Sequence, residues 1–490
     1  MAVAEARQPA ARARPRHAAT PALAIVVLVG GVAAAVVVGA RYPALLALSA
    51  GWLVLAAAVF RRPQLAVPVI VLLLPLEISK LFFPFLSTRQ ELGGGLPPTS
   101  IVDVGRLAIV TAGAVWALNP RLPRSLAFAG SALTLPSLTL LALYALSVLW
   151  ARDVEAARSE TLRLAFLIAF AALIPVFVRD RQTLRWCLFA LIASAALLAV
   201  AGVYQQATGV FFWNEGLGLY GERRINATFA DPNHFARLLL LALVLGIALF
   251  FFVERWWRPL LAAALAFCAL TLVFTGSRSA WLIAAPLLPL LVLLLPLSGR
   301  LRLRLLAAGG LALVAAVALG LAVSPYFRDR IETFRFGAEA SGARPYLIEA
   351  GLHMFRDHPV WGVGAGGYQD SFVNDYYYYK DPKIKANVTL SHTSAVTVIS
   401  ELGVLGAVAA LFLLFRWARI GGRLWANGAS ETKALVLGLW GMSLVILLSS
   451  QTEGRLFDDP YLWLAFGLGV ALQRIAREEE STSRAGLLSR

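Results

Sequence analysis

Long apolar stretches separated by short, arginine-containing turns are the feature that most constrains how this chain folds. A helix needs about 17–25 predominantly apolar residues to cross a bilayer, and stretches of this length recur along the chain. The composition agrees, because 59% of the 490 residues are hydrophobic and only 15% are charged, whereas a soluble domain has about 25% charged residues. The mean hydropathy is +0.72. The sequence therefore predicts an all-α polytopic membrane protein.

Fourteen stretches have the length and apolar character expected of membrane-spanning helices. They lie near residues 20–39, 43–60, 64–84, 101–118, 129–150, 161–178, 183–205, 234–253, 258–275, 279–297, 303–324, 392–415, 433–450 and 460–474. The basic N-terminus followed by an apolar stretch imitates a signal peptide. Because residues 20–39 are as long as a complete span and no convincing cleavage site follows, we expect a retained first helix.

The arginines between these stretches predict the orientation of the chain. Connections on the cytoplasmic side of a membrane carry an excess of Lys and Arg. If the N-terminus lies inside, the inner connections hold Arg61 and Arg62, the segment 179–185 and the segment 300–304. Short outer turns such as "GARYPA" carry one arginine or none. An even number of spans returns the C-terminus to the cytoplasm, so we expect an N-in, C-in protein.

Charge and cysteine content narrow the range of partners. The net charge of +16 and the pI near 10.4 would suit a nucleic-acid-binding protein. In a membrane protein the same charge is explained by arginines that set the topology and contact anionic lipids. We therefore expect membrane lipids, and no nucleic acid, as partners. Cys187 and Cys268 lie inside apolar stretches, which favours small buried side chains over a disulfide or a metal site.

The spacing of the apolar stretches predicts the domain organisation. The expected segments are a disordered basic cytoplasmic tail (1–19), N-terminal transmembrane helices (20–205), core transmembrane helices (206–324), a loop domain outside the membrane (325–391), C-terminal transmembrane helices (392–474) and a cytoplasmic tail (475–490). Within the loop domain, "RPYLIEAGLHMFRDH" has the apolar spacing of a helix. The following "PVWGVGAGGY" predicts a Gly-rich turn.

Three motifs with polar residues lie at the predicted outer ends of helices that run inward. They are "RRINATFADPNHFA" (223–236), "TGSRSAW" (275–281) and "SHTSAVTVISELGVLG" (391–406). Asp231 before a proline is typical of a helix N-cap. Ser277 or Ser279 is a candidate cap of the second helix, and Ser391 of the third. A helix N-terminus attracts anions. Three such ends together predict an anion-binding site at the outer membrane surface.

Each charged residue in these motifs also has an ordinary structural interpretation. Arg223 and Arg224 could be interface anchors, since arginines near helix ends commonly extend towards the headgroups. His392 and His234 could be polar residues at helix starts. Arg278 is harder to explain in this way, because it stands in a turn too short to need a cation. The occurrence of all three motifs at one depth favours a site.

Two other polar groups favour ordinary structure. Glu349, His353 and His358 have partial metal-ligand spacing, but a solvated helix face explains them better. Asp458 and Asp459 could hold a divalent cation or sugar hydroxyls. A solvated loop is the better interpretation of this acidic pair.

At these motifs the chain resembles the O-antigen ligase and polymerase family of bacterial envelope glycosyltransferases. The resemblance rests on "RINATFADPNHFA", "TGSRSAW", "RPYLIEAGLHMFRDHPVWGVGAGGY" and "SHTSAVTVISELGVLG", which occur in the family's order with its large outer loop before the histidine. It covers about residues 200–410. The chain departs from the family at Asp231, where an asparagine is expected in one version of the motif. The family's ligase core also has fewer spans, which leaves the role of the N-terminal helices open.

The resemblance implies a GT-C-type glycosyltransferase of the bacterial inner membrane with its active site facing the periplasm. Its donor would be a glycan on polyprenyl diphosphate. Its acceptor would be a hydroxyl of a lipid or a glycan, and lipid A–core is the acceptor that the resemblance favours. Neither a metal nor another cofactor is implied. By motif position, Arg224 and Arg278 would hold the diphosphate and His392 would act near the acceptor as catalytic residues. The implied substrate-binding residues are Arg223, Asn233, His234, Ser277, Arg344 and Ser391.

Three other functions remain open from the sequence. A polymerase that joins glycan repeats would share every residue named above, and an oligosaccharyltransferase would use protein hydroxyls as acceptors. A lipid-linked glycan transporter or flippase belongs to a different class. Transporters place ionisable groups near the bilayer midplane and often contain repeats. The outer position of the polar motifs therefore favours an enzyme.

Overall fold

The computed structural model describes residues 43–76, 104–211, 224–229, 231–323, 325–332, 344–376, 391–454 and 456–488. All regular secondary structure in these ranges is helical, as the sequence predicts. The expected tail at 1–19, the expected first span at 20–39 and Arg223 lie outside the described residues.

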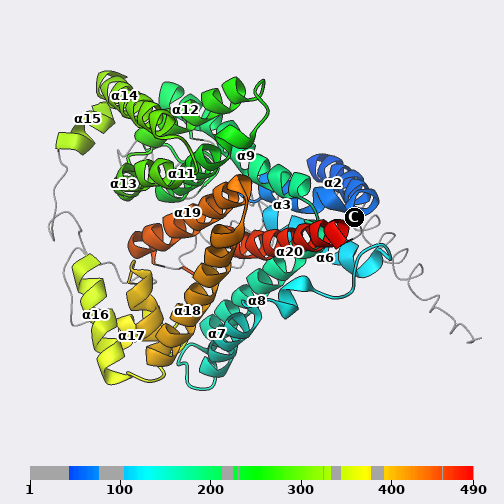
Figure 1. Ribbon diagram of the computed structural model, residues 1–490. Coiled ribbons are helices and arrows are strands. Elements are labelled where there is room, and N and C mark those ends of the chain that lie inside the picture. The colour runs from blue at the N-terminus through cyan, green and yellow to red at the C-terminus, as the bar shows by residue number, and fades with distance from the viewer. Residues whose placement is uncertain are drawn as a thin grey trace, which may run out of the picture.

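Figure 1 shows the helices in chain order, coloured from blue near the N-terminus to red at the C-terminus. The N-terminal helices are α2 (Pro43–Arg61), α3 (Ala66–Leu73), α6 (Val104–Leu118), α7 (Thr134–Ser147), α8 (Val154–Phe177) and α9 (Arg181–Thr208). The middle of the chain forms α11 (Pro232–Leu249), α12 (Arg258–Phe274), α13 (Arg278–Leu294), α14 (Gly299–Val323) and α15 (Pro325–Glu332). The loop domain contains α16 (Arg344–Asp357) and α17 (Tyr368–Asn374), and α18 (Ser394–Asn427), α19 (Ser430–Glu453) and α20 (Pro460–Leu488) follow.

The predicted spans from 43–60 onward all coincide with helices. The stretch 64–84 is only partly covered, because α3 ends at Leu73 and residues 77–100 lie outside the described part. Within the described residues, six helices are long and apolar enough to cross a membrane: α8, α9, α11 with the turn after it, α14, α18 and α19. The total of fourteen spans and the GT-C architecture stay predictions.

Helices α11 and α19 pack together in the middle of the bundle (Figure 1). Nearly every side chain of α11 from Phe235 to Leu249 is buried, against α9, α12, α13 and α19. Small residues let the two helices approach closely: a Cβ on Gly441 would lie 2.5 Å from Cγ1 of Val244. Helix α14 is equally apolar but almost entirely exposed. Such a helix is stable only where its surroundings are apolar, as in a bilayer.

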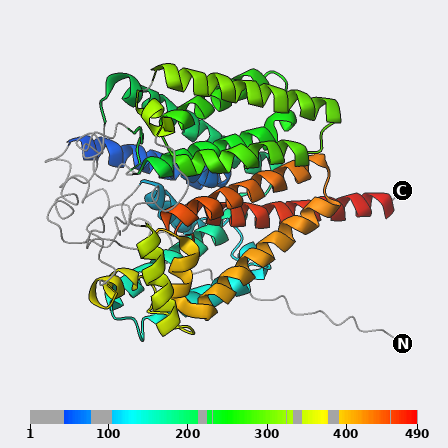
Figure 2. The same cartoon turned by 90° about the vertical axis from the view of Figure 1, so that its left-hand side faces the viewer.

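Arginines of the predicted inner connections gather at one end of the bundle. Arg181 at the start of α9 pairs with Glu479 on α20 at 2.6 Å, and Arg185 pairs with Glu431 at the start of α19. The three polar motifs gather at the opposite end, where α9 ends and α11, α13 and α18 begin. Figure 2 shows α16 and α17 at this motif end, on the left, and the C-terminus on the right.

Candidate functional site

Arg224 joins the first two motifs below the surface. Its Nε donates to the backbone carbonyl of Thr275 (3.1 Å), and its Nη2 donates to the side-chain oxygen of Asn233 (2.9 Å). The Ser277 hydroxyl donates to the same oxygen of Asn233 (2.9 Å). Arg224 is only 8% exposed. A buried cation therefore holds the starts of α11 and α13 together.

The starts of α11 and α13 are capped differently. Asp231 is the N-cap of α11 and accepts the N–H of Asn233 (2.7 Å), with Pro232 at the first helical position, as predicted. Ser277 occupies the N-cap position of α13 but caps no N–H group. Its hydroxyl is oriented towards Asn233 instead, so the predicted capping role of Ser277 is wrong. The same hydroxyl now links two motifs that are 44 residues apart.

His392 lies in a tight turn just before α18. The prediction that Ser391 caps this helix is wrong, because α18 begins at Ser394 and the Ser391 hydroxyl accepts the N–H of Thr393 (3.1 Å). His392 has a φ of 58°, in the left-handed region that few non-glycine residues adopt. Among the described non-glycine residues, only Ala227 in the first motif shares a positive φ. Backbone strain of this kind concentrates at functional sites.

The surroundings of His392 favour its neutral form. Burial and the guanidinium of Arg344 lower the pKa of His392 below its ordinary value of 6.5, and the carboxylate of Asp231 acts in the opposite direction. The imidazole is half-buried and therefore retains access from outside. A neutral, accessible histidine can accept a proton.

The loop domain brings Arg344 to this position. Arg344 is the first residue of α16, which packs along the beginning of α18. Gly351 allows the close approach, because a Cβ there would lie 2.5 Å from Cγ1 of Val396. The same buried face of α16 contributes Leu347 and Met354 to a small core that also contains Tyr368 and Phe372. Arg344 is thus held by a packed element and not by a free loop.

The Gly-rich turn after α16 inserts into a kink in α18. Three backbone hydrogen bonds of 2.9 Å join them: Val363 N–H to the Ser400 carbonyl, Gly364 N–H to the Glu401 carbonyl, and Val404 N–H to the Pro359 carbonyl. The kink lies at Gly403, which has a φ of 62°. The turn supplies partners for backbone groups that the kink removes from the helix ladder. It therefore fixes the direction of the α18 segment that follows His392.

A network of charges lies beside His234. Arg237 pairs with Glu453 at the end of α19 and, at 3.2 Å, with Asp459. The Nε2 atom of His234 lies 3.6 Å from the same Glu453 carboxylate. The interpretation of the acidic pair as a solvated loop is wrong, because Asp459 is only 4% exposed and Asp458 also forms an ion pair. The network ties α11, α19 and α20 together at the motif end.

Asp231 connects the two arginine motifs to the histidine. It caps the helix on which Asn233 is bonded to Arg224 and Ser277. It also interacts electrostatically with His392. The structure therefore brings residues from all three motifs into one electrostatic environment.

Arg278 and His234 flank this group. Arg278 directly follows Ser277 as the first residue of α13 and is half-buried, as is His234. Of the possible metal ligands, Glu349 is exposed on α16 and His358 is exposed just after it, as a solvated helix face predicts. No group of three metal-ligating side chains occurs anywhere in the part of the chain that the structure describes.

Three residues that position this site are not among the site residues predicted from the sequence. Gln205 bonds the loop that carries Arg224, and Arg237 and Glu453 join helices beneath it. Ionisable residues in or next to an apolar stretch are costly unless they are paired or functional. That rule could have identified Arg237 and Glu453 from the sequence. An uncharged glutamine within a span carries a weaker signal.

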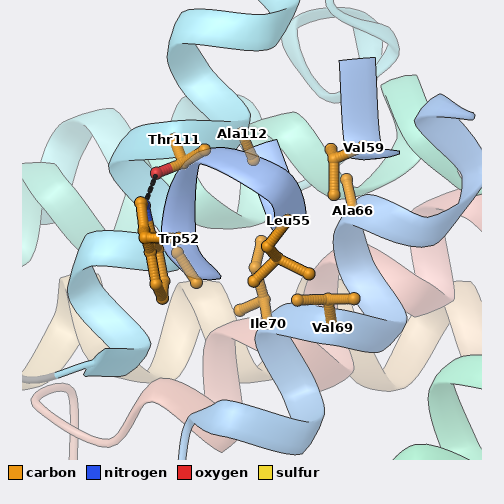
Figure 3. Close-up of a pocket in the computed structure, with 9 residues that line it drawn as sticks. Trp52, Leu55, Val59, Ala66, Val69, Ile70, Thr111 and Ala112 are labelled. Atoms are coloured by element: carbon orange, nitrogen blue, oxygen red, sulfur yellow. Dashed lines mark hydrogen bonds between the residues drawn. The ribbon is translucent and has the colours of Figure 1, made fainter. Parts of the chain in front are cut away.

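An apolar pocket among the N-terminal helices is chemically unlike this site (Figure 3). It is lined by side chains of α2, α3 and α6, including Trp52, Ile70 and Ala112. Its polar contact is a hydrogen bond of 3.1 Å from the Trp52 indole to the Thr111 hydroxyl. Nothing in this lining could bind a diphosphate or accept a proton at neutral pH.

Comparison with known proteins identifies one family. Residues 263–411 match the family described as O-Antigen ligase. The match includes the "TGSRSAW" motif, the loop domain and the His392 motif, whereas the Arg224 motif precedes it. No curated protein matches the chain. The resemblance to the O-antigen ligase family is confirmed for this segment, and the match supports a ligase- or polymerase-type function in general. The match and the six long apolar helices of the described residues together support a multi-pass membrane protein.

Proposed function

Because residues 263–411 carry the O-antigen ligase signature, we propose that the protein is a membrane glycosyltransferase of this type. It transfers a glycan from a polyprenyl diphosphate carrier to an acceptor hydroxyl, most of all on lipid A–core, at the periplasmic face of the inner membrane. The observation that supports this best is the convergence of the two arginine motifs and the His392 motif at one end of the bundle. A transporter would hold its ionisable groups near the midplane instead.

The cations of the site take different roles. Arg224 is buried and bonded to Thr275 and Asn233, so it contributes positive charge from beneath the site and fixes the two helix starts. Arg278 and Arg344 are half-buried at the first positions of α13 and α16. We assign the diphosphate to these two, since a planar guanidinium can bind phosphate oxygens in a bidentate manner. The free N–H groups of a helix start add to the attraction.

The reaction is a single displacement. The acceptor hydroxyl oxygen attacks the anomeric carbon and forms the new glycosidic bond, while the bond from that carbon to the diphosphate oxygen breaks. The polyprenyl diphosphate leaves with the electron pair, and the arginines stabilise its growing charge. The hydroxyl proton passes to the neutral imidazole of His392. Attack from the side opposite the leaving group inverts the anomeric centre.

Mass spectrometry of the product tests the proposal directly. The purified protein is incubated with a polyprenyl diphosphate glycan and, separately, with lipid A–core, a second glycan or a peptide rich in Ser and Thr. Ligase function predicts glycan-modified lipid A–core, unchanged in yield by EDTA. Products of multiplied glycan length indicate a polymerase and modified peptide an oligosaccharyltransferase. Movement of the lipid-linked glycan across liposomes without any transfer would overturn the enzymatic proposal.

The pH dependence of transfer should report the pKa of His392. The neutral imidazole is the active base, and its pKa is lowered, so we expect the acidic limb of kcat/KM below pH 6.5. Arg344→Gln removes a cation, raises the pKa of His392 and should move the limb to higher pH. Asp231→Asn removes an anion, keeps a capping side chain and should move the limb to lower pH. Shifts in the same direction would contradict the assignment.

A further inference from the structure

The loop that carries Arg224 rests on a single buried side chain from another helix. Gln205, near the end of α9, is 1% exposed. Its amide oxygen accepts the N–H groups of Asn226 (3.0 Å) and Ala227 (2.8 Å). Its amide nitrogen donates to the side-chain oxygen of Asn226 (3.2 Å) and to the carbonyl of Ala227 (3.3 Å). The oxygen and the nitrogen of the amide therefore both form hydrogen bonds with two consecutive residues of the loop.

These bonds hold a backbone that would not persist unaided. Ala227 has a φ of 49°, which lies in the left-handed region that is sterically unfavourable for alanine. Two further bonds complete the loop: the Asn226 amide donates to the Phe229 carbonyl (2.6 Å), and the Thr228 hydroxyl donates to the carbonyl of Pro75 (2.7 Å). Residues 226–228 are thus tied to α9 and to the segment after α3.

Arg224 lies only two residues before this anchored segment. On its other side it is bonded to Thr275 and Asn233. A cation that stabilises a leaving diphosphate must be in place before the charge develops. The amide of Gln205 supplies the fixed point from which the Arg224 backbone extends.

We propose that Gln205 is a positioning residue for glycan transfer, acting through Arg224. The proposal rests on the proposed function of the site, because it assigns to Gln205 the task of holding a cation that transfer requires. Gln205 itself touches no substrate. Replacing Gln205 therefore lowers the rate of glycan transfer only to the extent that Arg224 is displaced.

Hydrogen exchange provides a test that does not depend on activity. In Gln205→Leu the N–H groups of Asn226 and Ala227 lose their acceptor, so exchange in a peptide covering 224–229 should accelerate on the order of tenfold or more. The control is Gln473→Leu, the same change at a glutamine that is 9% exposed on α20. This control should leave the 224–229 peptide unchanged. Equal exchange in both variants and the wild type would overturn the proposal.

A double-variant comparison then separates positioning from general destabilisation. Gln205→Leu should lower kcat by about tenfold with its thermal midpoint close to that of Gln473→Leu. If Gln205 acts through Arg224, the double variant Gln205→Leu/Arg224→Lys should be no slower than Arg224→Lys within about twofold. A double variant that is slower by the product of the two single effects would overturn the proposal.

A second substitution keeps the test decisive if the leucine variant unfolds. Gln205→Glu retains the volume and the acceptor for both N–H groups but loses the two donors, so its exchange and kcat should lie between those of wild type and Gln205→Leu. Wild-type kcat in this variant together with wild-type exchange would count against the proposal. Failure of the proposed function is recognised separately, since the wild type would then form no product although the exchange effect remains.

Discussion

His392→Asn should lower the rate of glycan transfer by about 10²–10⁴-fold, the usual contribution of a positioned general base. Asparagine tolerates the left-handed backbone that His392 adopts, with its φ of 58°. It is polar but cannot accept a proton at neutral pH. The turn before α18 should therefore be retained while the base is lost. The rate is measured at saturating donor and acceptor, and the thermal midpoint of the purified variant shows whether the fold is intact.

The matched control for this variant is His358→Gln. His358 is exposed at the end of α16, at the same end of the bundle, and we expect this variant to transfer glycan at the wild-type rate. If His392→Asn also retained the wild-type rate, the assignment of His392 as the base would be dropped. His234, with its nearby carboxylate from Glu453, would then be the residue to test.

Gly403→Ala should lower transfer by at least about tenfold without touching any residue that contacts substrate. A Cβ at this position would lie 2.3 Å from the carbonyl oxygen of Val360, and the φ of 62° is unfavourable for alanine. Neither backbone segment can give way without breaking the bonds between the Gly-rich turn and α18. We expect the turn to detach, so that Arg344 and His392 no longer hold their relative positions.

Two measurements follow the detachment independently of activity. Exchange of the Val363 and Gly364 N–H groups should accelerate, because both bond to α18, and the loop domain should become more sensitive to protease. Gly422→Ala on the same helix is the control, since a Cβ there meets nothing within 4 Å and alanine favours a helix. Normal transfer and normal exchange in Gly403→Ala would falsify the role assigned to the kink.

Helix positions follow from the sequence because the signal is local. Each apolar stretch marks a helix through its own residues, and every one of the thirteen predicted from residue 43 onward overlaps a helix of the described part. The Asp231 cap is equally local, since the side chain bonds an N–H two residues ahead. The number of helices that span the membrane does not follow from such local signals. It depends on how short helices such as α12 and α13 are placed in the bilayer, which length and hydropathy do not decide.

The residues of the site are also predicted in part, because helix starts and their polar residues are local features of the sequence. The sequence identifies helix starts that can bind anions, and the residues at them, but not which residue is buried. Motif position implies the same role for Arg224 and Arg278, whereas packing buries Arg224 against Asn233 and leaves Arg278 half-buried. Ser277 has the chemistry of a cap, but its hydroxyl bonds Asn233 on another helix, and Ser391 lies outside the N-cap position because α18 begins at Ser394.

By itself, the sequence determined that the chain is a bundle of apolar helices, with its polar motifs at helix starts and a less apolar helix, α16, before His392. Local periodicity, charge placement and capping chemistry are sufficient for this. Only the tertiary structure decided that Arg344 lies near His392, that Gln205 holds the Arg224 loop and that a Gly-rich turn fills the kink at Gly403. These contacts join segments far apart in the chain, and close packing of several helices sets them.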